Sequence, residues 1–356
     1  MDNKISVTHR TGDYDIIFGD IFGNINEYLT ERDIKYFIVT DDIVFDLHAG
    51  KLLDSLLKRG YNASCHVIKS GESEKNLSTV SSIYTKLAEF KFTRGDIILA
   101  VGGGVVGDIA GFCAATYLRG ARFIQIPTTI LAQIDSSIGG KTGVDLPEGK
   151  NLVGAFHQPS AVLCDRDVIK TLPSDVYSDA FGEIIKYACL FDEGMFSSFE
   201  KHDYDIYDII AKCARFKAEI VMEDEFEKNI RACLNLGHTI GHAAEKYYSF
   251  TGLTHGKAVA LGIVYAAKFS YLKGFCSLNT LERTSRLVKT YGLPFRIEAD
   301  NEILAENCTA DKKRTPDGIK FIFINEIGRY RIEKIGQDEL KGLLYEADKL
   351  DDLGVV

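Results

Sequence analysis

The stretch Asp96-Ile-Ile-Leu-Ala-Val101-Gly-Gly-Gly-Val-Val-Gly107-Asp108 decides how the first half of the chain folds. A short apolar run ends in three glycines, and a segment with helical periodicity follows at once. Gly102, Gly104 and Gly107 fit the G-x-G-x-x-G spacing, in which glycines let backbone N–H groups approach a pyrophosphate at a helix N-terminus. The same glycines also suit a plain strand-to-helix turn, so the motif alone leaves both interpretations open.

Apolar runs and helical segments alternate on both sides of this turn. Strands are expected at 35–40, 65–69, 96–101, 122–126 and 161–164, and helices at 47–59, 76–90 and 105–117. Strands separated by helices are typical of a parallel sheet covered on both faces. We therefore expect residues 1–170 to form an α/β nucleotide-binding domain.

A dinucleotide in such a domain needs an acidic residue to hold its ribose. No Asp or Glu lies between Ile109 and Ile134, where the motif expects one. The ribose would then be held from elsewhere, by Asp41 after the first of these strands or by Glu72 and Lys75.

A long segment rich in Gly, Ser and Thr runs from residue 127 to 151. Such a loop inside a compact domain is usually functional. The donors and acceptors that it offers are Asp135, Lys141, Lys150 and Asn151.

From about Thr171 the pattern becomes helical. We expect a second, mainly α-helical domain over residues 171–356, with the active site in the cleft between the two domains. Glu183 and Lys186 share a helix face at i, i+3, and Lys217 lies on the apolar stripe of a helix over 205–222, where a lysine needs a partner. Two runs around Gly328, at 320–324 and 330–334, predict a β-hairpin.

Four polar residues in this half are spaced as one face of a helix. Arg231, Asn235, His238 and His242 stand at i, i+4, i+7 and i+11. Two histidines one turn apart, with His255 nearby, indicate a metal site, and spacing alone nominates His238 and His242 as the ligand pair.

Composition limits the class of protein. The chain has 356 residues, 46% hydrophobic and 26% charged, which is typical of a globular protein large enough for two domains. A net charge of −9 argues against nucleic acid and anionic membranes as partners. Without an apolar run of membrane-spanning or signal-peptide type, we expect a cytoplasmic protein, and the eight scattered cysteines predict reduced, mostly buried thiols.

Together these motifs resemble those of the 3-dehydroquinate synthase family, within the sugar phosphate cyclases. The resemblance spans roughly residues 35–335 and rests on 102–108, 127–142, 149–151, 182–186, 235–242, 255–256 and 311–313, which follow the family's order. It implies an NAD- and zinc-dependent lyase of the shikimate pathway, in which cobalt could replace zinc. Such an enzyme converts 3-deoxy-D-arabino-heptulosonate 7-phosphate to 3-dehydroquinate and phosphate by transient oxidation with NAD, phosphate elimination, re-reduction and intramolecular aldol closure.

The resemblance also implies site residues. The metal ligands become Glu183, His238 and His255, so His242 is moved from the metal to the substrate phosphate. The NAD contacts are Asp41, Glu72, Lys75, Gly103, Gly104, Asp108, Thr128, Thr129, Asp135, Lys150 and Thr171. The catalytic residues are Asp135, Lys141, Lys186, Lys217, Arg231, Asn235 and His242.

An anionic sugar-acid phosphate needs cations around it. Substrate contacts are implied for Arg119, Lys141, Asn151, Lys186, Lys217, Arg231, Asn235, His242, Lys312 and Lys313. Lys217 and Arg231 are expected near the carboxylate, and Lys141, His242 and one of Lys312 or Lys313 near the phosphate. Arg119 is expected to reach the neighbouring active site of a homodimer.

Three other functions stay open at this point. Another sugar phosphate cyclase, such as 2-deoxy-scyllo-inosose synthase, would act on a substrate without a carboxylate, which makes Arg231 hard to explain. A metal-dependent polyol dehydrogenase would release NADH, and a catalytically silent NAD-binding protein would not need the three metal ligands.

Overall fold

The computed structural model describes residues 3–249, 251–310 and 318–352, and the chain divides into two compact units. Unit 1 consists of Met1–Pro173 and Ile210–Glu227, and unit 2 of Ser174–Ile209 and Lys228–Val356. The division at Pro173 lies three residues beyond the expected boundary. The sequence analysis placed 210–227 in the second domain, whereas in the structure this segment packs with unit 1.

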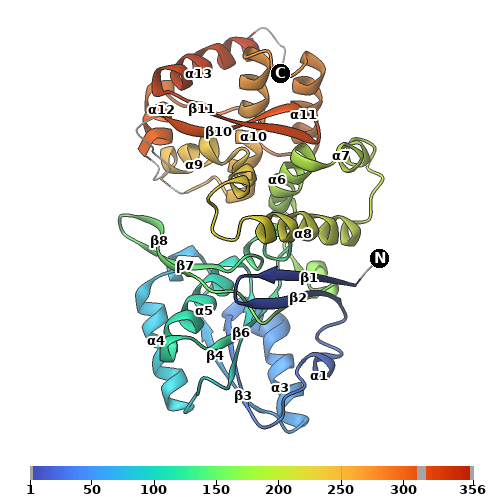
Figure 1. The fold of residues 1–356 in the computed structure, drawn as a ribbon, viewed down its shortest axis with the longest axis vertical. Helices are drawn as coiled ribbons and strands as arrows, with labels where there is room; N and C mark the ends of the chain where they lie inside the picture. Colours follow the sequence, from blue (N-terminus) through green and yellow to red (C-terminus); the bar gives the residue numbers. More distant parts are fainter. Residues whose placement is uncertain (1–2, 250, 311–317, 353–356) are drawn as a thin grey trace. The chain divides into compact units, whose positions relative to one another are not determined.

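Unit 1 is built on a seven-stranded sheet (Figure 1). Six strands run parallel and only β1 is antiparallel, to β2. In spatial order the strands are β1 (Lys4–His9), β2 (Gly12–Gly19), β9 (Ala161–Asp165), β6 (Arg122–Pro127), β5 (Ile97–Gly102), β3 (Lys35–Asp41) and β4 (Asn62–Ile68). The five expected strands are all present, and the expected parallel sheet is confirmed.

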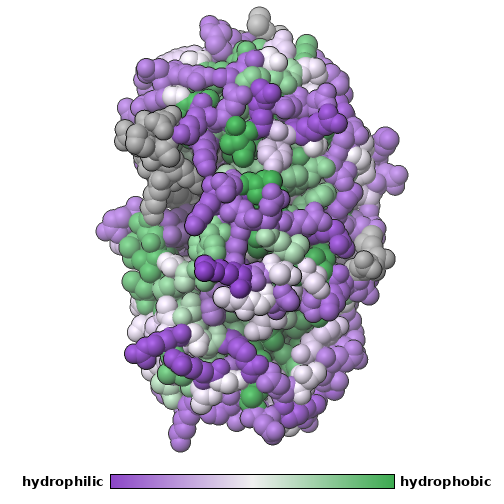
Figure 2. Space-filling model, in the orientation of Figure 1, coloured by the Kyte–Doolittle hydropathy of each residue, from purple (hydrophilic) through white to green (hydrophobic). Residues whose placement is uncertain are grey.

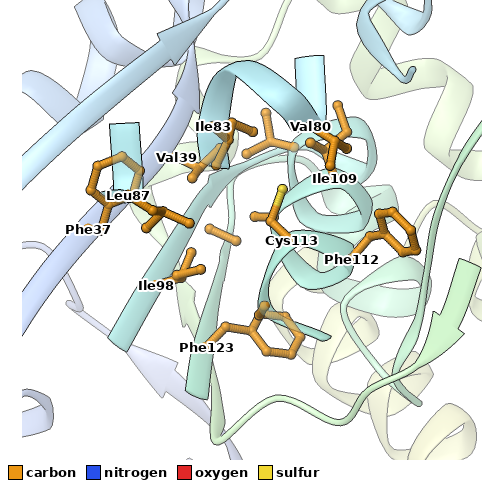
Figure 3. Packing of buried hydrophobic residues seen from close by; sticks show 14 of the residues in the cluster. Phe37, Val39, Val80, Ile83, Leu87, Ile98, Ile109, Phe112, Cys113 and Phe123 are labelled. Carbon is orange, nitrogen blue, oxygen red and sulfur yellow. The ribbon is translucent and has the colours of Figure 1, made fainter. Parts of the chain in front are cut away.

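Helices cover both faces of this sheet. Helices α4 (Leu77–Glu89) and α5 (Gly104–Thr116) pack on one face, and α1 (Ile25–Tyr28), η1 (Phe45–Ala49) and α3 (Gly50–Lys58) on the other. The unit also contains α2 (Asp42–Val44), η2 (Glu72–Glu74), η3 (Tyr117–Arg119), η4 (Ala132–Ser136), η5 (Asp167–Thr171) and, from Ile210 onward, α8 (Ile206–Glu223). Because side chains alternate along a strand, Phe37 and Ile98 point to α4 and α5 (Figure 3), while Ile38 and Leu99 point to α1 and α3. The two apolar cores follow directly from the continuous apolar runs of β3 and β5.

Two hairpins of unit 1 were missed by the sequence analysis. The N-terminal strands β1 and β2 form one, and the expected loop over 127–151 contains part of the other, β7 (Lys141–Leu146) with β8 (Gly149–Phe156). Glycines allow the second: a Cβ on Gly154 would lie 2.4 Å from the carbonyl oxygen of Thr142 on the facing strand. Gly, Ser and Thr there serve close strand pairing as well as loop formation.

Unit 2 is mainly helical, as expected. Its elements are α6 (Ser174–Phe191), α7 (Glu193–Glu200), η6 (Ile230–Asn235), α9 (His238–Tyr247), α10 (His255–Leu272), α11 (Leu278–Thr290), α12 (Asn301–Ala310), α13 (Gln337–Asp352) and the expected hairpin β10 (Ile319–Glu326) with β11 (Arg329–Ile335). Helix α10 is the centre of the unit, buried from Ala258 to Ser270 and packed against α6, α9, α11, α13 and β10. A helix that is apolar all round has to be surrounded in this way.

The described part of the chain holds no helix that is long and apolar enough to cross a membrane. Hydrophilic side chains cover most of the face seen in Figure 2, and its apolar side chains form separate patches. The cysteines are all free, and six of the eight are buried. The expectation of reduced, mostly buried thiols therefore agrees with the structure.

Candidate active site

Three helices of unit 2 bring together one carboxylate and two imidazoles. Glu183 lies on α6, His238 begins α9 and His255 begins α10. The Nε2 atoms of His238 and His255 lie 3.4 Å and 3.2 Å from Oε1 of Glu183. The three residues offer ligand atoms that all lie within 4.8 Å of one another.

These distances fit a divalent metal ion. Two ligands of a tetrahedral zinc site, each about 2.0–2.1 Å from the ion, lie about 3.3 Å apart. Glu183 is 1% exposed, so this carboxylate is sheltered from competing water. Burial alone would lower the pKa of His255, but the hydrogen bond and charge of Glu183 raise it above its ordinary value. The three side chains thus form a compact, partly desolvated donor set for a cation.

Glycines beside each of the three residues set the approach of the helices. A Cβ on Gly182, next to Glu183, would lie 1.9 Å from the carbonyl oxygen of Gly256, next to His255. A Cβ on Gly262 of α10 would lie 1.8 Å from the carbonyl oxygen of Gly237, next to His238. Only glycine permits these backbone contacts, so the donor set depends on residues that carry no functional group.

The predicted single helix through Arg231 and His242 is wrong. The chain forms the 3₁₀ helix η6, leaves it at Leu236, and begins α9 only at His238. Gly237 has a φ of +80°, a left-handed conformation that interrupts any continuous helix. Arg231 and Asn235 are therefore on a different element from His238 and His242.

His242 nevertheless lies close to the donor set. Its ring centroid is 5.3 Å from that of His238 and 6.1 Å from that of His255. His242 forms a second group of possible ligands with Glu245 and His255. The spacing of the histidines thus predicted the correct region of the chain. The two histidines of the predicted pair, however, belong to different groups of possible ligands, and the group with Glu183 contains only His238.

Buried cations accompany this cluster in unit 2. Lys186 is 1% exposed and forms an ion pair with Glu183. Arg231 is also 1% exposed and is the largest fully buried side chain among the described residues. Buried cations are costly unless anions or hydrogen-bond acceptors surround them, and Glu183 is such a partner for Lys186.

In unit 1 the glycine turn lies where the order of the sheet changes direction. From β3 the chain goes to β4 on one side and then to β5 on the other. Ligands of open parallel sheets bind at such a point, beyond the carboxyl ends of the strands. Asp41 ends β3, and Gly102 ends β5.

The residues around this turn pack closely and form hydrogen bonds with one another. Gly103 caps the N-terminus of α5, and a Cβ there would meet Thr129 at 3.3 Å. Thr128 donates its backbone N–H to Gly102, over 3.0 Å. Asp41 accepts a hydrogen bond from the backbone of Val44 at 2.9 Å, while its burial raises its pKa. The turn leaves an amide-rich helix N-terminus of the kind that binds phosphate.

Lys75, Asp108 and Asn151 form one network in unit 1, in which Lys75 is buried and Asn151 is exposed. The Nζ of Lys75 lies 2.7 Å from both the Asp108 carboxylate and the Asn151 amide oxygen. Burial raises the pKa of Asp108 to about 6, against the lowering effect of Lys75. Burial alone would lower the pKa of Lys75, but Asp108 raises it above its ordinary value. Asn151, expected at the substrate, therefore lies among the residues expected at the cofactor.

Two further ion pairs of unit 1 involve expected site residues. The buried Lys217 of α8 lies 2.8 Å from Asp135 of η4, which supplies the partner that its position on an apolar stripe required. Lys141 forms an ion pair with Glu227. Sequence reasoning missed Glu227, since no spacing pattern connects residues 86 positions apart.

The remaining expected residues are placed as follows. Lys150 lies 3.7 Å from Glu72, and Thr171 contacts the ring of His48 at 2.8 Å. Arg119 is exposed and has a φ of +67°, in the short turn that follows α5. Lys312 and Lys313 lie outside the described residues.

Known proteins share both halves of this arrangement. A family model described as 3-dehydroquinate synthase N-terminal matches residues 65–179, and one described as 3-dehydroquinate synthase C-terminal matches residues 180–314. The chain belongs to the 3-dehydroquinate synthase family. The 3-dehydroquinate synthase of Clostridium acetobutylicum is 44% identical over 312 residues, which cover 86% of this chain and 88% of that protein.

Solved structures show the same fold at lower identity. One is 2-deoxy-scyllo-inosose synthase with carbaglucose-6-phosphate, NAD+ and Co2+, at a TM-score of 0.86 and 24% identity, covering 96% of this chain and 99% of that one. Another is ValA, the 2-epi-5-epi-valiolone synthase of Streptomyces hygroscopicus subsp. jinggangensis, with NAD+ and Zn2+, at 0.87 and 23%, covering 97% and 99%. The 3-dehydroquinate synthase family thus shares its fold with other sugar phosphate cyclases.

Proposed function

We propose that this chain converts 3-deoxy-D-arabino-heptulosonate 7-phosphate to 3-dehydroquinate and phosphate. Membership of the 3-dehydroquinate synthase family supports the reaction, and the 44% identity to a curated relative extends over most of both chains. The observation that carries the chemistry is the donor set of Glu183, His238 and His255. A cytoplasmic location and a homodimer, with Arg119 reaching the neighbouring active site, are part of the same proposal.

The cofactors are NAD and a divalent metal ion. A divalent ion bound there would supply a Lewis acid for a substrate hydroxyl, and NAD would supply a reversible hydride acceptor. Glu183, His238 and His255 hold the ion, because a carboxylate and two imidazoles leave a coordination position for substrate. Two cyclases of the same fold hold NAD+ with Co2+ or with Zn2+, which supports this pair of cofactors.

NAD is assigned to the turn at Gly103 and Gly104. The free N–H groups at the start of α5 stabilise its pyrophosphate, and Asp41 at the end of β3 accepts hydrogen bonds from a ribose. The other contacts assigned to NAD are Glu72, Lys75, Asp108, Thr128, Thr129, Asp135, Lys150 and Thr171.

The substrate carries a carboxylate and a phosphate, which need cations to neutralise them. Arg231 and Lys217 are assigned to the carboxylate, and Lys141 and His242 to the phosphate. Lys186, Asn235 and Asn151 complete the set, together with Arg119 and one of Lys312 or Lys313. Lys217 and Lys141 have internal carboxylate partners, Asp135 and Glu227, which hold the two ammonium groups in place.

Phosphate release tests the reaction. Purified protein with the heptulosonate phosphate and a catalytic amount of NAD+ should release phosphate, lose this activity with a chelator and regain it with Zn2+ or Co2+. NADH absorbance should not accumulate, because each hydride returns to the product. Accumulating NADH would indicate a polyol dehydrogenase, and turnover only of a sugar phosphate without a carboxylate would indicate another cyclase.

Arg231 tests the substrate assignment. In Arg231→Ala the KM for the heptulosonate phosphate should rise by about 100-fold, since a charge-assisted pair in a desolvated site contributes about 2–3 kcal/mol. The Kd for NAD+, measured by isothermal titration calorimetry, should stay within twofold. Arg231→Lys is the matched control, which keeps the charge and should lose less. Equal damage to substrate and NAD+ binding contradicts the placement of Arg231 at the carboxylate.

A further inference from the structure

His238 and His255 present the same ring nitrogen to Glu183. In both residues Nε2 faces Oε1 of Glu183, at 3.4 Å and 3.2 Å. The opposite nitrogen, Nδ1, therefore decides whether Nε2 has a lone pair to offer, because a neutral imidazole carries one proton and one lone pair. Whatever accepts a hydrogen bond from Nδ1 fixes the tautomer that can bind a metal.

For His238 the acceptor is part of the backbone. Its Nδ1 lies 3.1 Å from the carbonyl oxygen of Leu236. Since a carbonyl oxygen only accepts, this contact places the proton on Nδ1 and leaves Nε2 available. The kink at Gly237, which ended the predicted long helix, supplies this geometry.

For His255 the group in the same position is a carboxylate. Nδ1 of His255 lies 4.0 Å from Oε1 of Glu245, a residue of α9 that is only 4% exposed. The distance is about 1 Å longer than a hydrogen bond, so a hydrogen bond between the two groups requires a rotation of one of the side chains. As the acceptor of the Nδ1 hydrogen, a carboxylate makes the imidazole more basic than a backbone carbonyl would, and a more basic imidazole binds a metal ion more strongly.

The backbone of His255 is held separately. The carboxylate of Asp179, on α6, accepts hydrogen bonds from the backbone N–H groups of Gly256 and Lys257, at 3.2 Å and 2.9 Å, and from the hydroxyl of Thr254. With the start of α10 fixed in this way, the freedom left to His255 is rotation of its side chain. Glu245 faces Nδ1 of His255, and a hydrogen bond at this atom would fix the rotation of the ring.

We propose that Glu245 is a positioning residue, whose carboxylate accepts the Nδ1 hydrogen of His255 and so directs Nε2 to the metal ion. This inference rests on the proposed metal-dependent function. Glu245 also belongs to the group with His242 and His255 that could hold an ion of its own. That second ion would use Nδ1 of His255 while Nε2 binds the first, and a neutral imidazole offers only one lone pair. One metal ion per chain is therefore expected.

Metal affinity of the metal-free full-length protein tests the proposal, by chelator competition with Zn2+. Glu245→Ala should bind Zn2+ about 10–100-fold more weakly, the usual effect of removing a group that orients a histidine ligand. Glu245→Gln should lose less, because its amide oxygen still accepts the hydrogen bond. The Co2+-loaded variants should also show a changed visible absorption spectrum, which a purely structural role would leave unaltered.

Lys246→Gln is the matched control, since it changes one charge at the next position of α9, where the side chain is exposed. It should bind Zn2+ like the wild type, and all variants should keep their affinity for NAD+. His255→Ala tests the metal site itself, separately from the role of Glu245. If His255→Ala loses Zn2+ while Glu245→Ala and Glu245→Gln bind it normally, the role of Glu245 is refuted and the metal site stands.

Wild-type affinity in His255→Ala refutes the metal site itself, and with it the proposed function. Two Zn2+ ions per chain, falling to one in both Glu245→Ala and His242→Ala, would make Glu245 a ligand and overturn the positioning role. If Glu245→Ala does not fold, Glu245→Gln decides, since it keeps the volume of the side chain; wild-type affinity and an unchanged Co2+ spectrum in Glu245→Gln would overturn the proposal.

Discussion

At the scale of single residues, several cationic side chains of this protein are buried. Lys75, Lys186, Lys217 and Arg231 are all less than 9% exposed. Each buried cation loses hydration, and a nearby carboxylate restores only part of that free energy. Carboxylates lie beside three of them: Asp108 beside Lys75, Glu183 beside Lys186 and Asp135 beside Lys217.

Asp108 should make the free energy of unfolding depend on pH. Its pKa in the folded protein is about 6, above the ordinary value of 3.8, because burial disfavours the carboxylate. The folded state therefore holds this proton more tightly than the unfolded state. The stability that Asp108 contributes is complete below about pH 4 and is lost as the pH rises through about 6.

Asp108→Asn tests this dependence, since the amide does not titrate. The free energy of unfolding of the wild type minus that of the variant should fall by about 2–3 kcal/mol between pH 4 and pH 6.5, and then level off. Urea unfolding at several pH values measures it, and the comparison concerns the slope, because the variant also removes a partner of Lys75. A difference that rises or stays constant over this range contradicts the assigned pKa.

At the scale of elements, glycine contacts between helices build the metal site. Helices α6, α9 and α10 each carry one proposed ligand, and each ligand has a glycine beside it in the chain. The contacts of Gly182 with Gly256 and of Gly237 with Gly262 bring the backbones close together. Side chains of ordinary size would separate the helices and spread the three ligands.

Gly182→Ala should therefore damage both stability and metal binding. Its Cβ would overlap the carbonyl oxygen of Gly256, so α6 and α10 must move apart, at a cost of about 3 kcal/mol. We expect a lower melting temperature and a zinc content well below one per chain, measured by calorimetry and atomic absorption.

Gly342→Ala is the control for that experiment in the same unit. Gly342 is exposed on α13, and a Cβ there meets nothing within 4 Å. Alanine should stabilise this helix by about 0.5–1 kcal/mol and leave the zinc content unchanged. If both variants behave alike, the contact between Gly182 and Gly256 does not hold the ligands together.

The elements also show where sequence patterns fail. The apolar runs predicted all five expected strands, because a strand buried on both faces needs apolar side chains throughout. The Gly-rich segment beyond Asp135 was predicted as a loop, yet Lys141–Leu146 and Gly149–Phe156 pair as strands. Glycine permits both outcomes, and only the contact with the facing strand decides between them.

At the scale of the whole molecule, the two proposed cofactor sites fall in different units. Unit 1 contains the glycine turn and the residues assigned to NAD, and unit 2 contains the three proposed metal ligands. Zn2+ and NAD+ should therefore each stabilise the unit that binds it. Because each binds only the folded form of that unit, its binding makes local unfolding less frequent.

Hydrogen exchange can locate these effects. Zn2+ added to the metal-free protein should slow amide exchange about 10-fold or more in α6, α9 and the start of α10, where ligand binding adds at least about 1.4 kcal/mol to local stability. NAD+ should slow exchange around β5 and the start of α5. In His255→Ala the effect of Zn2+ should disappear while that of NAD+ remains. Protection of α5 by Zn2+ alone would contradict this placement of the two sites.

The sequence by itself determined the fold class and the family, because apolar periodicity is local and the family's motifs are short and contiguous. The family's motifs also implied Glu183, His238 and His255 as metal ligands, where spacing alone had nominated His238 and His242, and this ligand set stays a prediction. Only the tertiary structure decided which side chains meet: Lys217 with Asp135, Lys141 with Glu227, Asn151 with Lys75, and Glu245 with His255. For the first three pairs the partners are 76 to 86 residues apart, and packing alone sets their distances. Glu245 lies nearer to His255 in the chain, yet it faces that ring only because α9 and α10 pack through glycines.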